Sequence, residues 1–115
     1  MLEIFKEFVF YAAHQVACFG QNHKCNRLHG HSYHLTVFAE TSVDNPYEFG
    51  KLEADCLKVI QMLDHNYLND LKDHLGGEPT TERLACWILR ELRNASHPVT
   101  RLTLKETNSS GVVAS

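Results

Sequence analysis

The sequence predicts an α+β fold, a four-stranded antiparallel sheet with two helices on one face, with its elements in the order ββααββ. Segments near both ends of the chain alternate apolar and polar residues, as half-buried strands do. Two central segments instead repeat their apolar residues at helical spacing. Strands grouped around a helix pair favour an antiparallel sheet covered on one face. The length of 115 residues suits a single domain over residues 1–115.

The first strand is expected over residues 4–14. Its alternate residues form an apolar stripe that ends in a histidine: Phe8, Phe10, Ala12 and His14. Taken alone, His14 is better explained as a hydrogen-bonded core histidine than as a ligand. Residues 15–24 have no period and contain Gly20 and Asn22, so they are expected to form a loop that leads to an antiparallel neighbour.

The second strand is expected from His29 to Glu40 and opens with the pattern His29-Gly30-His31. Because side chains alternate along a strand, the two histidines share a face and stand about 7 Å apart. Two histidine side chains can close that separation by converging on one metal ion. Gly30 leaves the other face without bulk, so a ligand or another backbone can approach there.

A turn at residues 42–47 precedes the first helix, which is expected over residues 48–63. Its apolar residues recur at helical spacing: Phe49, Leu52, Cys56, Val59, Ile60 and Leu63. The polar and aromatic segment 64–70 follows and places Asp64 beside His65. Without other motifs, this pair is explained as the solvated end of a helix.

The segment Gly76-Gly77-Glu78-Pro79 interrupts the chain before the second helix. Thr80 or Thr81 can supply the capping oxygen, and the helix is expected to end near Arg93. Its buried stripe is expected to contain Leu84, Ala85, Ile88, Leu89 and Leu92, with Trp87 at the edge.

The third strand is expected over residues 99–107. Leu102, Leu104 and Glu106 share one face, so a face that starts apolar ends in a carboxylate. Taken alone, Glu106 is equally well explained as a charge that emerges into solvent. Val112 and Val113 suggest a short fourth strand. Such a sheet has two edges, which proteins commonly protect by pairing with another subunit, so a homo-oligomer is expected.

Composition limits the possible partners. The net charge of −3 and the pI near 6.2 give no electrostatic footprint for nucleic acid or an anionic membrane, although Lys24 and Arg27 could form a small basic pocket. No apolar run could span a bilayer, and the first residues do not resemble a secretion signal, so a cytoplasmic protein is expected. The cysteines are therefore expected to be reduced, with Cys56 and Cys86 buried in helices.

His14, placed at the end of a neighbouring strand, would join His29 and His31 to give three nitrogen ligands. Three protein ligands are typical of a catalytic zinc site that keeps an open position. Cys25, four residues before His29, offers a fourth ligand and therefore a structural Cys-His-His-His alternative. The further polar groups at element ends, Asp64 with His65 and Glu106, favour the catalytic interpretation.

Five motifs stand in order along the chain: Phe8-x-Phe10-x-Ala12-Ala13-His14, Cys25-x-x-x-His29-Gly30-His31-x-Tyr33, Leu63-Asp64-His65-x-x-Leu68-Asn69, Pro79-Thr80-Thr81-Glu82 and Lys105-Glu106-Thr107. Together they resemble the family of 6-pyruvoyltetrahydropterin and 6-carboxytetrahydropterin synthases, over nearly the whole chain. The resemblance implies the tunnelling fold, in which three subunits join their sheets into a barrel and two trimers stack into a hexamer. It also implies Zn²⁺ held by His14, His29 and His31.

The resemblance further implies a role for each remaining site residue. Cys25 would be the general base, with Asp64 and His65 as its partners in proton transfer. Glu106 would anchor the guanidine-like edge of a pterin, and Thr80 and Thr81 would add pterin contacts. A carboxylate can accept two parallel N–H bonds from such a ring, while zinc can polarise the side-chain oxygens of the substrate.

The compact size and the cysteine ahead of His29-Gly30-His31 most resemble the 6-carboxytetrahydropterin synthases of 7-deazaguanine and queuosine synthesis. These convert 7,8-dihydroneopterin triphosphate to 6-carboxytetrahydropterin, acetaldehyde and triphosphate. The alternatives are the pyruvoyl-forming synthase, which eliminates triphosphate and keeps the two-carbon fragment, and a non-catalytic, zinc-stabilised pterin-binding oligomer. The chain departs from the family at residues 45–49, where the usual turn is longer and an aspartate stands in place of Glu48.

Overall fold

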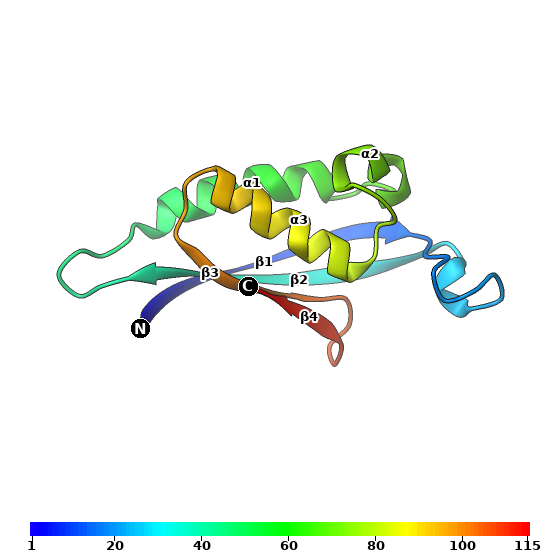
Figure 1. Cartoon of the computed structure of the whole chain (residues 1–115), viewed down its shortest axis with the longest axis horizontal. Helices are drawn as coiled ribbons and strands as arrows, with labels where there is room; N and C mark the ends of the chain where they lie inside the picture. Colours follow the sequence, from blue (N-terminus) through cyan, green and yellow to red (C-terminus); the bar gives the residue numbers. More distant parts are fainter.

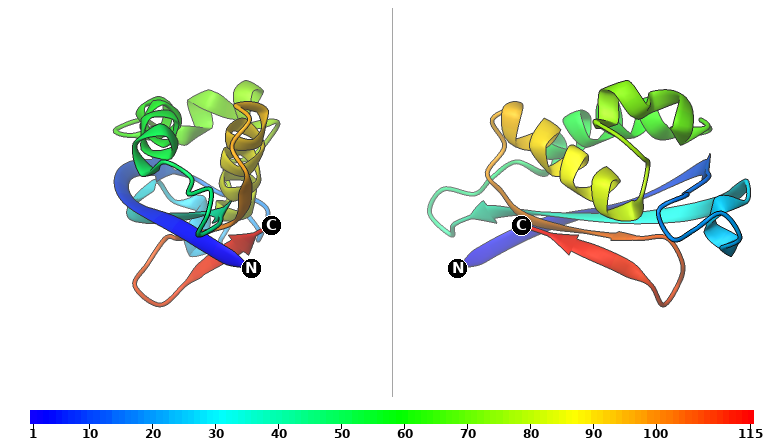
Figure 2. Two further views of the ribbon diagram at one scale, coloured as in Figure 1. Left: turned by 90° about the vertical axis from the view of Figure 1, so that its left-hand side faces the viewer. Right: turned by 45° about the vertical axis from the view of Figure 1, so that its right-hand side comes forward.

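The computed structural model describes residues 1–115 and confirms the predicted α+β class. One antiparallel sheet has the strand order β1-β2-β3-β4, and the helices cover one of its faces (Figures 1 and 2). The strands are β1 (Leu2–His14), β2 (His29–Thr41), β3 (Val99–Lys105) and β4 (Gly111–Ala114). The helices are α1 (Phe49–Leu63), α2 (Lys72–Leu75) and α3 (Thr81–Asn94), with 3₁₀ turns η1 (Lys24–Asn26) and η2 (Leu68–Leu71).

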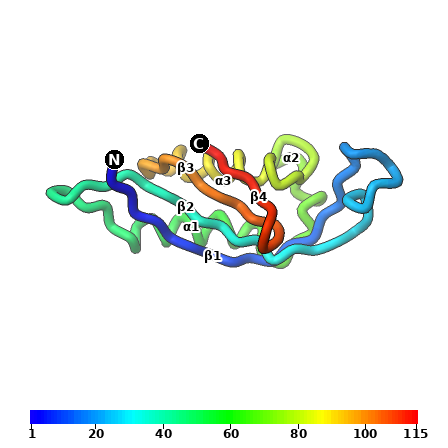
Figure 3. The backbone as a smooth tube through the Cα atoms, turned by 90° about the horizontal axis from the view of Figure 1, so that it is seen from below, coloured from blue at the N-terminus to red at the C-terminus, as the bar shows by residue number.

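The two long strands form a hairpin whose register positions the later site. The pairing is continuous from Leu2 opposite Thr41 to His14 opposite His29. The order β1-β2-β3-β4 leaves β1 and β4 at the sheet edges, as the view of the helix-free face shows (Figure 3). The hairpin extends well beyond the helices at the loop that joins its strands, and the molecule is correspondingly long, 54 × 26 × 19 Å.

The hydrophobic core lies between the helices and the sheet face that carries the odd-numbered residues of β2. The strands contribute Phe10, Tyr33, Leu35, Val37, Leu102 and Leu104, and the helices contribute Leu52, Cys56, Ile60, Leu63, Leu84, Ile88 and Leu92. Burial raises the pKa of the Cys56 thiol to about 12, so this cysteine is a small apolar core residue, as predicted. None of the helices has the length and apolar character needed to cross a bilayer.

Four local predictions are corrected by the structure. Cys86 is exposed, because it lies two residues after the buried Leu84 and therefore on the opposite side of α3. Trp87 is buried, because it lies three residues after Leu84 and therefore beside the buried stripe. Phe49 is half exposed because it opens α1 beyond the covered face. Strand β3 stops at Lys105 rather than continuing to 107, since the Glu106 amide already donates to the Ser110 carbonyl across the turn.

His97 links three segments, although the sequence indicated only a turn there. Its buried ring is joined to the Tyr47 hydroxyl through Nδ1 (2.6 Å) and to the Asp55 carboxylate through Nε2 (2.5 Å). Lys58 lies 3.5 Å from the same carboxylate. These contacts fasten the turn before α1, and α1 itself, to the segment that enters β3. The hydrogen bond from His97 holds the pKa of Asp55 below its usual range.

We expect Asp55→Asn to lower the free energy of unfolding most near neutral pH. The carboxyl pKa is lower in the folded than in the unfolded chain, so its contribution is present above about pH 4 and lost as pH falls through the lowered folded pKa. Urea unfolding of both proteins across this range measures the difference, with Asp44→Asn in the exposed turn as the matched control. A difference that does not shrink on acidification would contradict the assignment.

Candidate metal site and adjoining cavity

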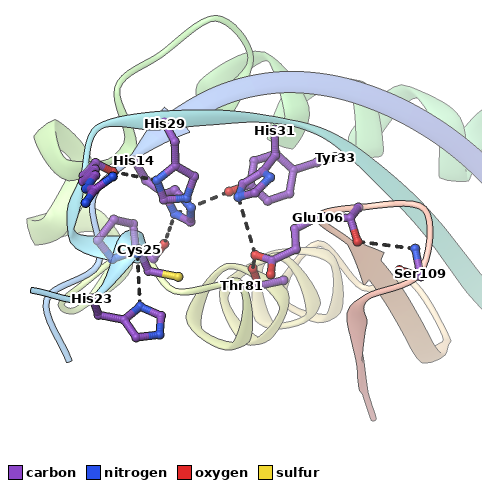
Figure 4. Close-up of polar contacts among 12 residues, drawn as sticks. His14, His23, Cys25, His29, His31, Tyr33, Thr81, Glu106 and Ser109 are labelled. Carbon is purple, nitrogen blue, oxygen red and sulfur yellow. Dashed lines mark hydrogen bonds and ion pairs between the residues drawn. The ribbon is translucent and has the colours of Figure 1, made fainter. Parts of the chain in front are cut away.

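Three histidines converge where the hairpin emerges from the core. His14 ends β1, and His29 and His31 open β2 on the same face. One ligand atom of each lies within 4.8 Å of the others, and the ring centroids are 4.5 to 5.2 Å apart (Figure 4). Three imidazole nitrogens at this separation can share one metal ion. The structure therefore brings together the residues that the sequence nominated as ligands.

Backbone carbonyls orient two of these rings. Nδ1 of His14 lies 2.8 Å from the Pro79 carbonyl oxygen, and Nδ1 of His29 lies 2.7 Å from that of Arg27. A carbonyl only accepts, so both Nδ1 atoms carry the proton and donate, and each Nε2 keeps a lone pair for a metal. Such outer contacts fix the tautomer and the ring orientation of metal-binding histidines.

Burial favours the neutral form of two of the three imidazoles. Burial lowers the pKa of His14, and the neighbouring His29 and His31 lower it further. Burial also lowers the pKa of His31, against an opposing effect of the Glu106 carboxylate. A neutral imidazole is the form that binds metal, because protonation occupies the lone pair. This donor set fits a divalent transition-metal ion.

A cavity of about 610 Å³ lies beside the histidines. Its wall comes from the end of β1 and the loop that follows, the η1 turn, the beginning of β2, the beginning of α3, and the turn from β3 into β4. Among the predicted site residues it includes His14, Cys25, His29, His31, Thr80, Thr81 and Glu106. Most of the residues that line it are polar, and its Cys25 and Glu106 lie on different sides of the histidines (Figure 4).

The Cys25 backbone is held against the end of β1. The Val16 amide donates to the Cys25 carbonyl (2.7 Å), and the Gln15 side-chain amide donates to the Asn26 carbonyl (3.2 Å). The Cys25 amide donates to Nδ1 of His23 (3.1 Å), which completes the η1 turn. These bonds keep the partly buried thiol at the cavity wall.

Gln15 is fixed in turn by residues that follow α1. The Tyr67 hydroxyl donates to its side-chain oxygen (2.6 Å), and the Asn69 side chain bonds both its backbone amide and its carbonyl (2.9 Å each). The sequence reasoning missed this support. Asn69 belongs to the motif Leu63-Asp64-His65-x-x-Leu68-Asn69, but no local pattern indicated that Asn69 or Tyr67 would contact Gln15.

Glu106 lies in the turn just after β3 and faces the cavity. One oxygen, Oε2, accepts from the Thr81 hydroxyl (2.6 Å) and lies 3.8 Å from Nε2 of His31. Thr81 is buried in the first turn of α3. Thr80 caps that helix, since its hydroxyl accepts from the Arg83 amide (3.1 Å). Behind the cluster, burial and the Glu106 charge raise the pKa of Tyr33, which keeps this phenol neutral.

Asp64 and His65 do not join this group within one chain. The Asp64 carboxylate accepts from the Tyr11 amide (2.9 Å), and the His65 amide donates to the Tyr11 carbonyl (2.6 Å). Both residues therefore bind the free edge of β1. His65 has a left-handed backbone (φ 59°) that turns the chain after α1, and its ring borders a separate hollow beside Gly30. Neither residue lines the cavity that contains Cys25.

The fold and the site define an α+β protein with a cluster of three histidines that can hold a metal, beside a thiol in one cavity. The chain belongs to the 6-pyruvoyl tetrahydropterin synthase family, whose match covers residues 3–115. It is 41% identical to the 6-carboxy-5,6,7,8-tetrahydropterin synthase of Synechocystis sp., over 83% of this chain and 78% of that protein. It is 35% identical to the dihydroneopterin monophosphate aldolase of Pyrococcus furiosus, over 90% and 88% of the two chains.

Solved structures share the fold at low sequence identity. The 6-pyruvoyl tetrahydropterin synthase of Caenorhabditis elegans superposes with a TM-score of 0.83 at 21% identity, over 98% of this chain and 94% of that one. An uncharacterized protein of Wolinella succinogenes gives a TM-score of 0.77 at 19% identity, over 98% and 97% of the chains. These matches support the tunnelling fold that the sequence motifs implied.

We expect His31→Ala to lower the affinity for a divalent transition metal by more than about a hundredfold, because loss of a ligand costs more than loss of an outer contact. The matched control is His34→Ala, whose exposed side chain lies on the other face of β2. Metal content after dialysis against a weak chelator distinguishes the two variants. Full retention of the metal by His31→Ala would contradict the site.

Proposed function

We propose that this protein is a zinc-dependent 6-carboxy-5,6,7,8-tetrahydropterin synthase of 7-deazaguanine and queuosine biosynthesis. It would act in the cytoplasm as a single-domain subunit of a hexamer, on 7,8-dihydroneopterin triphosphate. The observation that carries the proposal is the three-histidine cluster, which shares one cavity with Cys25 and Glu106. The identity of 41% to the Synechocystis synthase supports the choice of reaction.

The residues of the cavity fit the steps of such a reaction. His14, His29 and His31 would hold zinc, which when bound supplies Lewis acidity to the side-chain oxygens of the substrate. Glu106 would accept N–H bonds from the pterin ring through its second oxygen, because only Oε2 is engaged by Thr81. Cys25 would take a proton from the substrate side chain as the general base.

Two other reactions use the same substrate class. The pyruvoyl-forming synthase would share the histidines and eliminate triphosphate without loss of the two-carbon fragment. The match to the Pyrococcus aldolase, over 90% of this chain, instead favours dihydroneopterin monophosphate as the substrate. A non-catalytic pterin-binding oligomer is the alternative outside enzyme chemistry, and it would use Cys25 as a fourth zinc ligand.

One experiment distinguishes the proposed reaction from these alternatives. The zinc-loaded protein is incubated with each dihydroneopterin phosphate, and the pterin product is identified by mass. The proposal requires 6-carboxytetrahydropterin together with acetaldehyde and triphosphate. A pyruvoyl product, or cleavage of the monophosphate alone, would replace it with the corresponding alternative. Tight pterin binding with no product would favour the non-catalytic oligomer.

We expect Cys25→Ala to keep zinc and pterin affinity but to lower product formation by about a hundredfold or more, the scale of a positioned base. The reason is that the three histidines and Glu106 remain in place. Cys18→Ala is the matched control, because Cys18 is an exposed thiol in the same loop that does not line the cavity. Zinc content, pterin titration and product assay are made on one preparation. Loss of zinc from Cys25→Ala would favour the structural Cys-His-His-His site.

If Asp64 and His65 assist Cys25, a neighbouring subunit must supply them, since one chain holds them outside its own cavity. The position of His65 at the β1 edge supports this arrangement, because its side chain is 78% exposed, whereas the Asp64 side chain beside it is partly buried. The hexamer would then form each active site from two chains. This arrangement predicts that an active site can combine the Cys25 of one chain with the Asp64 and His65 of another.

Coexpressing Cys25→Ala with Asp64→Ala tests this view. Each variant alone should be nearly inactive, whereas random mixing should restore about a quarter of the sites, those in which both contributing chains are intact at the relevant residue. The measurement is product formation by mixed oligomers purified through two different tags. Mixed oligomers as inactive as both parents would place the two residues in the same chain as their cysteine. Full activity of the Asp64→Ala protein alone would instead remove Asp64 from the mechanism.

A further inference from the structure

We infer that Lys24 binds the phosphate chain of the substrate and so selects phosphorylated over unphosphorylated pterins. This inference rests on the proposed function, which makes the substrate a phosphorylated pterin. A phosphate chain carries several negative charges, and burying them beside other acids is unfavourable without a cation. A cavity that binds this substrate must therefore present a positive group to the phosphates.

Lys24 is the sole lysine or arginine in the cavity wall. The same wall carries two carboxylates, Glu82 and Glu106. No carboxylate lies within 4.0 Å of Lys24, whereas Lys6, Lys58 and Arg101 each pair with an acid. Its ammonium group is thus free for an anionic ligand.

The order of groups along the cavity matches the order of groups in the substrate. Glu106 lies on one side of the histidines and Cys25, the neighbour of Lys24, lies on another (Figure 4). A pterin ring held at Glu106 would place its three-carbon side chain at the histidines. The phosphates that follow would then reach the η1 turn and Lys24.

The backbone of Lys24 is fixed, while its side chain is exposed and can follow a ligand. The Lys24 carbonyl accepts from the Arg27 amide (3.1 Å), and the adjacent Cys25 carbonyl accepts from Val16 (2.7 Å). An ammonium group on a flexible stem is a point charge that binds phosphate without a demand for a single geometry. Because it is solvent-exposed, its contribution should weaken as salt is raised.

Arg27 provides a matched control for charge alone. It lies on the same turn and pairs with no acid, but it does not line the cavity. If the general field of the turn attracted the phosphates, Arg27→Gln would act as strongly as Lys24→Gln. Direct recognition requires an effect at Lys24 that clearly exceeds the effect at Arg27 and that Lys24→Arg restores in part.

The experiment uses the zinc-loaded Cys25→Ala protein, in which chemistry is blocked. Calorimetric titration measures the affinity for 7,8-dihydroneopterin triphosphate and for 7,8-dihydroneopterin. It is made on this parent and on three double variants that add Lys24→Gln, Lys24→Arg or Arg27→Gln. We expect Lys24→Gln to lower the affinity for the triphosphate by about tenfold or more, the scale of a charge-assisted hydrogen bond. The affinity for dihydroneopterin should change by less than about twofold.

The inference would be overturned if Lys24→Gln lowered the affinity for both ligands equally, or for neither. A parent that binds the two pterins equally well would also overturn it, although pterin binding and the proposed function would then stand. A parent that binds neither pterin would overturn the proposed function and this inference with it. Product formation by the unsubstituted protein, assayed separately, keeps failure of the reaction distinguishable from failure of phosphate recognition.

Discussion

The register between β1 and β2 sets His14 opposite His29, and the rest of the site is built on that pair. Antiparallel pairing alternates faces with a period of two, so a slip of one residue would move His14 away from the face that holds His29 and His31. The long apolar stripe of β1 and β2 opposes such a slip, because it would also expose Phe10, Tyr33 and Leu35. The core that stabilises the sheet therefore also fixes the ligand geometry.

The candidate metal site is the uncovered end of the core face. Along β2 the same face carries His29 and His31, then buried Tyr33, Leu35 and Val37. The helices cover the apolar part, the Pro79 carbonyl ahead of α3 accepts from His14, and Thr81 in the first turn of α3 donates to Glu106. Burial lowers the pKa of His14 and of His31, while the Pro79 and Arg27 carbonyls accept from Nδ1 of His14 and of His29. One sheet face thus carries the histidine cluster at one end and core residues along the rest.

The features predicted correctly were those with a local period. Alternation defined the two long strands and placed His29 and His31 on one face, and helical spacing located α1 and α3. What periodicity could not give were contacts between distant segments, such as Pro79 with His14 or Asn69 with Gln15. Such contacts depend on how the whole chain packs. For the same reason the end of β3 was misplaced, because a turn bond to Ser110 ended a pattern that alternation alone would have continued.

The segment after α1 ties the edge of the sheet to the site. Its backbone bonds β1 at Tyr11 and Ala13, so this part of the edge cannot pair with another strand. The remaining free edges are β4 and the beginning of β1. The same segment holds Gln15 and hence the Cys25 turn through Tyr67 and Asn69. Edge protection and support of the thiol are therefore two consequences of one packing interaction, and a change in this segment would disturb both together.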